Sequence, residues 1–191
     1  MTWKEHKNGT ERVAEVAENI AGDVYITLQG DEPLIEPYNI DKIIDLMISD
    51  SNIECATLKT AYQNPVDIIN GTTPKVVSDL QENVMLFTRS PVPYPKSSID
   101  YKIFKPMGLY GFKRGALRIY RKLNIGPIEK AEDIELLRFI ENGIKIRIIE
   151  TESETVAVDT PKDLERVREI VEKRNLLCGG GGGGSTMTSH S

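Results

Sequence analysis

An acidic pair follows a short apolar run near the start of the chain. Residues 24–28 are mostly β-branched or aromatic, as in a buried parallel strand, and Gln29-Gly30-Asp31-Glu32-Pro33 comes directly after them. Gly30 leaves space for the close approach of a backbone or a ligand, and Pro33 cannot continue a strand ladder. The pattern favours a metal or substrate site at a strand tip. An ordinary strand-to-helix turn with solvated acids is an equal alternative from these residues alone.

A second carboxylate, Asp159, has a similar setting near the other end of the chain. It follows the strand-like run Val156-Ala157-Val158 and precedes Thr160-Pro161. Those two residues are typical of a helix start, with Thr160 as the N-cap and Asp163 three residues later. Because an acid beside a helix start is favoured by the helix dipole, Asp159 alone is more often structural. Two acids at strand ends together favour a shared site.

The elements that would position these acids alternate along the chain without a repeat. Apolar periodicity predicts helices over residues 10–20, 38–49, 114–123, 129–142 and 161–173, and strands near 24–29, 54–60, 75–78, 84–88, 108–112 and 144–150. This alternation predicts an α/β domain with a mostly parallel sheet, whose ligands bind beyond the carboxyl ends of the strands. Residues 89–107 lack a clean period, so we expect them to leave the sheet.

Five blocks of sequence occur in the order expected for one enzyme family. They are Asn8-Gly9-Thr10-Glu11-Arg12-Val13-Ala14-Glu15-Val16, Leu28-Gln29-Gly30-Asp31-Glu32-Pro33-Leu34-Ile35, Thr88-Arg89-Ser90-Pro91-Val92-Pro93-Tyr94-Pro95, Gly108-Leu109-Tyr110-Gly111-Phe112 and Val158-Asp159-Thr160-Pro161-Lys162-Asp163-Leu164-Glu165. From about His6 to about Arg174 the chain therefore resembles the 3-deoxy-manno-octulosonate cytidylyltransferases, also called CMP-KDO synthetases.

The resemblance implies a fold, a reaction and partners. The fold is a three-layer nucleotide-diphospho-sugar transferase fold, in a homodimer whose contact includes the region 89–107. The reaction transfers CMP from CTP to the anomeric hydroxyl of a 2-keto-3-deoxy sugar acid and releases pyrophosphate, for lipopolysaccharide biosynthesis. Mg²⁺ suits this reaction, because it can neutralise the phosphates, orient the attacking oxygen and stabilise the leaving group.

The resemblance also implies roles for individual residues. Asp31 and Asp159 match metal ligands and, with Arg89, are the expected catalytic residues. A planar guanidinium suits the carboxylate of the sugar acid. The residues matched to the sugar-acid pocket are Gln29, Arg89, Tyr110 and Glu135, and those matched to the nucleotide are Asn8, Gly9, Thr10, Arg12 and Lys75.

Several of these residues have ordinary structural explanations as well. Arg89 also fits a surface arginine after a strand, and Tyr110 fits a core position. Asn8 followed three residues later by Glu11 is a helix-start signature, although free N–H groups at a helix start also suit an anion. Lys75 equally fits a strand-edge lysine that favours solubility.

The sequence departs from the family in two ways. Family members begin with a strand and a loop rich in Arg, Ser, Gly and Lys that holds the triphosphate. This sequence has no such loop, so we expect a domain that is truncated at its N-terminus. Pro106 and Leu136 replace a usual histidine and a usual glutamine. These changes leave open an amino-octulosonate or nine-carbon sugar acid as the substrate, and a non-catalytic dimerisation or regulatory partner as the alternative to an enzyme.

Composition predicts a single cytoplasmic domain. The 191 residues are 39% apolar, enough for one core, and no apolar stretch approaches the roughly 20 residues that span a bilayer. The sequence shows no apolar signal segment, and Cys55 and Cys178 make no disulfide framework. A net charge of −5 without a basic stripe disfavours nucleic acid. We expect the domain to cover residues 1–175, and 176–191 to be a glycine-rich linker and tail.

Overall fold

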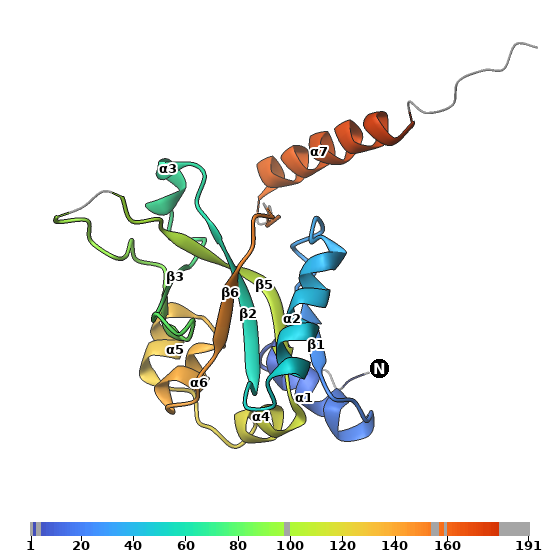
Figure 1. Ribbon diagram of the computed structural model, residues 1–191, viewed down its shortest axis with the longest axis vertical. Coiled ribbons are helices and arrows are strands. Elements are labelled where there is room, and N and C mark those ends of the chain that lie inside the picture. Colours follow the sequence, from blue (N-terminus) through green and yellow to red (C-terminus); the bar gives the residue numbers. More distant parts are fainter. Residues whose placement is uncertain (1, 3–4, 98–99, 154–156, 159, 180–191) are drawn as a thin grey trace, which may run out of the picture.

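The structure, a computed structural model, describes residues 2, 5–97, 100–153, 157, 158 and 160–179 (Figure 1). Its helices are α1 (Gly9–Asn19), α2 (Pro37–Ser49), α3 (Pro65–Ile68), α4 (Arg114–Tyr120), α5 (Pro127–Glu132), α6 (Leu137–Glu141) and α7 (Pro161–Gly179). Its strands are β1 (Tyr25–Leu28), β2 (Cys55–Ala61), β3 (Lys75–Ser78), β4 (Val84–Thr88), β5 (Phe104–Phe112) and β6 (Arg147–Glu150). No helix in these ranges is both long and apolar enough to cross a membrane.

One sheet is built around β5. Strand β2 pairs with β5 from Phe112 to Phe104 and so occupies one of its two edges. On the other edge, β1 pairs with residues 109–112 of β5 and β3 pairs at Phe104. The sheet order is β4-β3-β5-β2-β6, with β1 beside β5. The tip of β1 and the start of β3 therefore face each other across the middle of one edge of β5.

The prediction of a mostly parallel sheet is wrong for the described strands. Only the pairing of β2 with β6 is parallel, and the other four pairings are antiparallel. Strands β1, β2, β3 and β6 point the same way, but β5 lies among them and runs in the opposite direction. β5 follows β4 along the chain, and the described residues between them form no helix, so no helical crossover imposes a parallel direction.

Helices cover both faces of the sheet, which confirms the predicted three layers. On one face α1, α4 and α6 pack through Ala14, Ala17, Leu117, Tyr120 and Phe139. On the other face α2 packs Ile43 and Met47 against the sheet. Gly111 of β5 permits this contact, because a Cβ there would lie 2.4 Å from Ile43 Cγ2 and 2.6 Å from Met47 Sδ.

Several predicted elements differ from the observed ones at their ends. The helix predicted over 129–142 is divided into α5 and α6, because Asp133 has φ 53°, a left-handed conformation that ends α5. β5 begins at Phe104, before the predicted residue 108, and the short α3 was not predicted. α7 continues to Gly179, beyond the expected domain end at residue 175, and extends away from the sheet (Figure 1).

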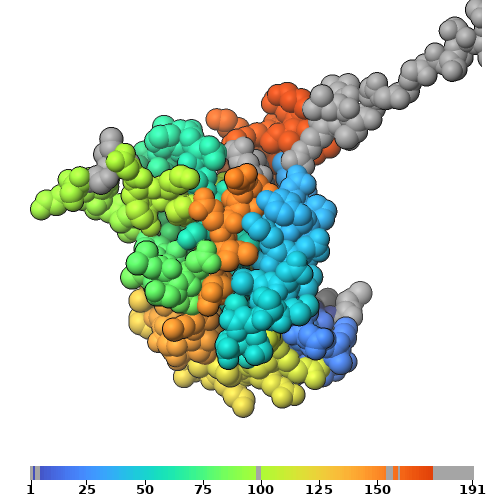
Figure 2. Space-filling model, viewed as in Figure 1, coloured from blue at the N-terminus to red at the C-terminus, as the bar shows by residue number. Residues whose placement is uncertain are grey.

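Residues after β4 leave the sheet, as predicted. This yellow-green segment projects from the side of the molecule (Figure 2), and the side chain of Tyr94 within it is 85% exposed. The predicted departure ends at Phe104, where the chain re-enters the sheet as β5.

Candidate active site

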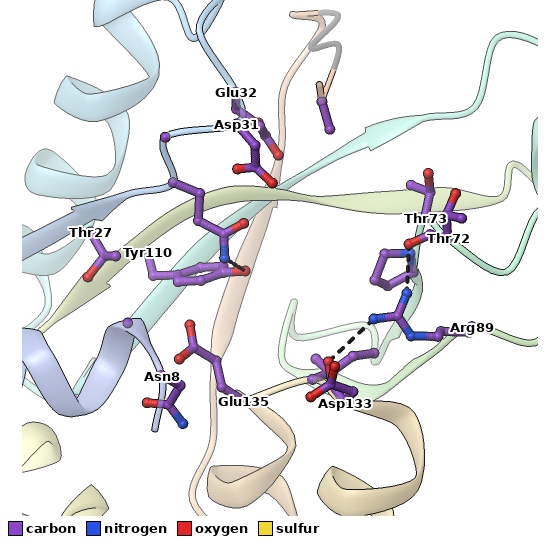
Figure 3. A pocket seen from close by; sticks show the side chains of 16 residues that line it. Asn8, Thr27, Asp31, Glu32, Thr72, Thr73, Arg89, Tyr110, Asp133 and Glu135 are labelled. Atoms are coloured by element: carbon purple, nitrogen blue, oxygen red, sulfur yellow. Dashed lines mark hydrogen bonds between the residues drawn. The ribbon is translucent and has the colours of Figure 1, made fainter. Parts of the chain in front are cut away.

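A cavity of about 590 Å³ lies beside β5, between the tip of β1 and the loop that leads into β3 (Figure 3). Seven of the predicted site residues line it: Asn8, Gly9, Gln29, Asp31, Arg89, Tyr110 and Glu135. Further residues of its wall are Glu32, Thr72, Thr73, Pro74 and Asp133. The seven predicted residues come from five separate parts of the chain and meet at one place.

Gln29 and Tyr110 meet because β1 pairs with β5. The backbone N–H of Gln29 donates to the Gly108 carbonyl at 2.9 Å and extends that pairing beyond β1. Gln29 Nε2 then donates to the Tyr110 hydroxyl at 3.2 Å. Burial, followed by the nearby carboxylate of Glu135, raises the pKa of Tyr110, so the phenol stays protonated. Tyr110 belongs to the core, as its sequence pattern predicts, and it also lines the cavity.

Glu32 lines the cavity, although no role of its own was predicted for it. Its Oε1 accepts a hydrogen bond from the Gly108 N–H at 2.7 Å. A Cβ at Gly108 would lie 2.8 Å from Glu32 Oε1 and 2.9 Å from Gln29 Oε1. Glycine at this position therefore allows both side chains to approach β5. The signal for Glu32 was its place in the acidic pair with Asp31.

The carboxylate of Asp31 is exposed at the cavity, and its backbone contacts the second predicted acidic segment. Its carbonyl accepts a hydrogen bond from the Val158 N–H at 2.8 Å. Asp159 itself lies outside the described residues. Thr160 and Asp163 form the predicted capping pair, since the Asp163 N–H donates to Thr160 Oγ1 at 3.3 Å and the Thr160 N–H donates to Asp163 Oδ2 at 2.9 Å.

Glu135 is held against the start of α1. Its Oε2 accepts from the Thr10 N–H at 3.0 Å, and its backbone carbonyl accepts from the Tyr120 hydroxyl at 3.2 Å. Burial raises the pKa of the Glu135 carboxyl, although the Thr10 N–H opposes the shift. Asn8 is the predicted N-cap, because its Oδ1 accepts from the Glu11 N–H at 2.9 Å.

Arg89 lies at the cavity as predicted, but most of its hydrogen-bond donors are already used. Nε donates to the Glu132 carbonyl at 2.7 Å, and Nη1 donates to the carbonyls of Gly71 at 3.1 Å and Thr72 at 2.7 Å. Nη2 makes a longer bond of 3.4 Å to the Asp133 carbonyl. Because a guanidinium has five N–H groups, one Nη2 hydrogen remains for a ligand.

Both sequence-based expectations for Lys75 are wrong. The side chain is fully buried and does not line the cavity, so it is neither a nucleotide contact nor a strand-edge solubility residue. Its Nζ donates to the carbonyls of Asn70 at 2.6 Å, Thr73 at 3.0 Å and Arg89 at 3.0 Å. Since an ammonium has three hydrogens, this geometry leaves none for a nucleotide. Burial also lowers the pKa of Lys75.

Two further predicted nucleotide contacts do not reach the cavity with their side chains. Thr10 is fully buried, and the cavity lining does not include it. It contributes instead through its N–H, which binds Glu135. Arg12 is exposed on α1 and also lies outside the cavity lining. The helix-start pattern therefore placed the backbone of residues 8–10 correctly, but it could not tell which side chains turn toward the site.

Comparisons with known proteins assign the family. Residues 1–146 match the cytidylyltransferase family model. The 3-deoxy-manno-octulosonate cytidylyltransferase of Solibacter usitatus (strain Ellin6076) is 41% identical over 94% of this chain and 71% of its own length. The enzyme of the same name from Fusobacterium nucleatum subsp. nucleatum is 40% identical over 92% of this chain and 72% of its own length. The chain belongs to the cytidylyltransferase family.

A solved structure extends the likeness to three dimensions. It is a CMP:2-keto-3-deoxy-manno-octonic acid synthetase complexed with CTP, and it is 36% identical to this cytidylyltransferase chain. The match covers 91% of this chain and 72% of the other, with a TM-score of 0.85. The fold is therefore that of this family.

Pro106 and Leu136 stand at the positions where a histidine and a glutamine were expected. Pro106 lies in β5 opposite Lys59 of β2, and it is not part of the cavity lining. Leu136 follows Glu135 in the chain, is 1% exposed and belongs to the core. Neither residue therefore places a polar side chain in the cavity.

The residues present fit a magnesium ion shared with the nucleotide. Within the described residues, no group of three or more His, Cys, Asp or Glu side chains could hold a metal ion alone. Asp31 offers an exposed carboxylate in the cavity lining. Mg²⁺ is usually bound by one or two carboxylates together with substrate phosphates and water, so one protein carboxylate at this position suits it.

Proposed function

We propose that this cytidylyltransferase transfers CMP from CTP to the anomeric hydroxyl of 3-deoxy-manno-octulosonate and releases pyrophosphate. The observation that carries the proposal is the meeting of Gln29, Asp31, Tyr110 and Glu135 in one cavity. Gln29 and Asp31 come from one matching block, Tyr110 comes from another, and Glu135 matches a further position of the family. Two relatives at 40–41% identity carry the name of this activity. CTP is the second substrate, as in the complex of the structural relative.

The cavity offers groups of both hydrogen-bonding kinds to a sugar acid. The Gln29 amide and the Tyr110 hydroxyl can bind the sugar's hydroxyls and carboxylate, and the remaining Nη2 hydrogen of Arg89 adds a cationic donor. Glu135 is half-buried beside them and accepts hydrogen bonds from sugar hydroxyls. These contacts orient the anomeric hydroxyl for attack on the α-phosphorus of CTP, where the bond to pyrophosphate breaks as the new P–O bond forms.

We include Mg²⁺ in the proposal, with Asp31 and Asp159 as its protein ligands. The bound ion would neutralise the phosphates and stabilise the pyrophosphate leaving group. Asp31 lies in the cavity wall, and the chain neighbour of Asp159, Val158, binds the Asp31 carbonyl. This backbone contact brings the segment that ends at Val158 to the same end of the cavity as Asp31, which supports Asp31 as one ligand.

A homodimer in the cytoplasm completes the proposal. The segment after β4 projects from the molecule and exposes Tyr94 (Figure 2). A protruding aromatic side chain suits a protein contact, and the family resemblance assigns this region to the dimer. Cys55 is a free, buried thiol, which suits a reducing compartment.

An amino-octulosonate or a nine-carbon sugar acid is the second candidate substrate. The observation that favours it is the burial of Leu136, which cannot supply the hydrogen bonds of the usual glutamine. A site that lacks a polar partner for one sugar hydroxyl discriminates less strongly between related sugars.

The test measures binding and turnover separately. Calorimetric titration of the purified protein with each sugar acid should show octulosonate binding more tightly than the alternatives. CMP-sugar formation is then followed with CTP and Mg²⁺. A chelator should abolish product formation. The proposal fails if octulosonate neither binds nor yields product.

A further inference from the structure

The loop of residues 70–73 separates two cavities. Thr72 and Thr73 line the 590 Å³ cavity described above, and they also line a second cavity of about 490 Å³ together with Asn70. A segment with open space on both sides gains little from packing, because few atoms surround it. Hydrogen bonds must therefore fix the position of this loop.

Two cations bind four consecutive carbonyl groups of the loop. Lys75 Nζ binds the first and the last, those of Asn70 and Thr73. Arg89 Nη1 binds the two between them, those of Gly71 and Thr72. The two cations are also joined to each other, because Lys75 Nζ donates to the Arg89 carbonyl at 3.0 Å. Hydrogen bonds from charged donors are stronger than those between neutral groups.

Arg89 connects this loop to the opposite wall of the cavity. Its Nε and Nη2 bind the carbonyls of Glu132 and Asp133, which directly precede the segment carrying Glu135 (Figure 3). Glu132 in turn accepts from the Arg89 N–H at 2.8 Å through its carboxylate. Arg89, whose own carbonyl is bound by Lys75, therefore fixes the separation between Thr72 and the Glu135 side of the cavity.

Burying the ammonium of Lys75 is costly for folding. The side chain is fully buried and its three acceptors are neutral carbonyls, whereas buried cations in proteins are generally paired with anions. An apolar side chain of similar length would fill the same space without that desolvation cost. The arrangement is explained if the position of the loop matters for ligand binding.

We propose that Lys75 is a positioning residue, which with Arg89 holds loop 70–73 as one wall of the sugar-acid cavity. The identity of the ligand rests on the function proposed above, but the control of the loop does not. Loss of Lys75 should free the loop and weaken sugar-acid binding, although Lys75 never touches the ligand. Substitutions that act on a ligand through the surrounding structure typically change affinity by up to about tenfold.

The experiment compares Lys75→Met with Lys59→Met. Lys59 is a matched control, because it is 9% exposed, lies on β2 and binds Ser78 Oγ at 2.6 Å rather than the loop. Hydrogen exchange of the peptide containing residues 70–74 is measured by mass spectrometry, beside calorimetry with octulosonate and thermal unfolding. In Lys75→Met, exchange of this peptide should accelerate about tenfold while β2 and β5 remain protected, and octulosonate binding should weaken about tenfold. Lys59→Met should change neither.

A second variant covers the case in which Lys75→Met does not fold. The Tyr62 hydroxyl donates to the carbonyls of Thr73 at 3.3 Å and Pro74 at 3.2 Å, so Tyr62→Phe removes a weaker hold on the end of the same loop. It should accelerate exchange of the loop peptide to a smaller extent. Unchanged exchange in a folded Lys75→Met variant, or in Tyr62→Phe if the first variant is unfolded, overturns the positioning role. If wild type binds no sugar acid, the proposed substrate is wrong, and the exchange comparison still decides the role of Lys75.

Discussion

The two sides of the cavity are held by different kinds of hydrogen bond. On the side of β1 and β5, backbone pairing sets the positions of Gln29 and Tyr110. On the side of loop 70–73, side-chain cations bind backbone carbonyls, and no strand pairing holds the loop. The first side follows from strand patterns that are visible in the sequence. The second depends on contacts between residues that no local pattern connects.

The largest effect is expected at the tip of β1. Asp31→Asn removes a negative charge from the proposed metal site, so CMP-sugar formation should fall by about 10²–10³-fold, as after loss of one electrostatic stabiliser. Circular dichroism should be unchanged, because Asp31 is exposed. Asp23→Asn is the control, since Asp23 is also exposed but lies just before the first residue of β1, at the opposite end of the strand from Asp31. Near-normal turnover by Asp31→Asn would remove this residue from the metal site.

Replacing one glycine by alanine on each side of the cavity tests how tightly each side is packed. A Cβ at Gly108 would meet Glu32 and Gln29, whereas a Cβ at Gly71 would have no neighbour within 4 Å. Gly108→Ala should therefore lower the free energy of unfolding by about 1–3 kcal/mol and weaken octulosonate binding. Gly71→Ala keeps the carbonyl that Arg89 binds and should stay within about 0.5 kcal/mol of wild type. Denaturant unfolding measures both, and equal losses would show that the β5 side is not the more tightly packed one.

The elements and one side of the site could be predicted from the sequence. The apolar run before Asp31 and the capping pattern at Asn8 depend on neighbouring residues, and the structure confirms both. The direction of β5 could not be predicted, because strand direction depends on the connection and not on the strand's own residues. Neither could the break at Asp133, since its left-handed conformation interrupts a helix whose apolar pattern continues.

The role of Lys75 shows why the other side could not be predicted. A lysine that begins a short β-branched run has the same local pattern whether it faces water or the interior. Its burial depends on the carbonyls of the loop that precedes it and on the carbonyl of Arg89, which comes directly after the neighbouring strand β4. The resemblance to a family lysine identified position 75 as important. It could not distinguish a residue that contacts the ligand from one that holds loop 70–73 in place.

A pH-dependent effect is expected at Glu135. Burial raises the pKa of this carboxyl above its usual 4.5, so the folded protein binds more protons than the unfolded chain between the two pKa values. The free energy of unfolding therefore falls as pH rises through that interval, and the loss persists at neutral pH. Glu135→Gln cannot titrate and keeps an acceptor for the Thr10 N–H. The free energy of unfolding of Glu135→Gln minus that of wild type should therefore be larger at about pH 7 than at about pH 4, as measured by urea unfolding. An unchanged difference between the two pH values would show that Glu135 has an ordinary pKa.

The smallest effect is expected at Arg12, which tests the boundary of the site. Arg12 is exposed on α1 and does not line the cavity, and its side chain makes no hydrogen bond within the described part of the chain. Alanine has a slightly higher helix propensity than arginine, so Arg12→Ala should change the free energy of unfolding by less than about 0.5 kcal/mol. CTP and octulosonate affinities should stay within about twofold, because no contact in the cavity is lost. Calorimetry with each ligand checks this, with Gly108→Ala as the variant that should respond. A tenfold loss of CTP affinity in Arg12→Ala would place this arginine in the nucleotide site and extend the site beyond the β1 and β5 side of the cavity.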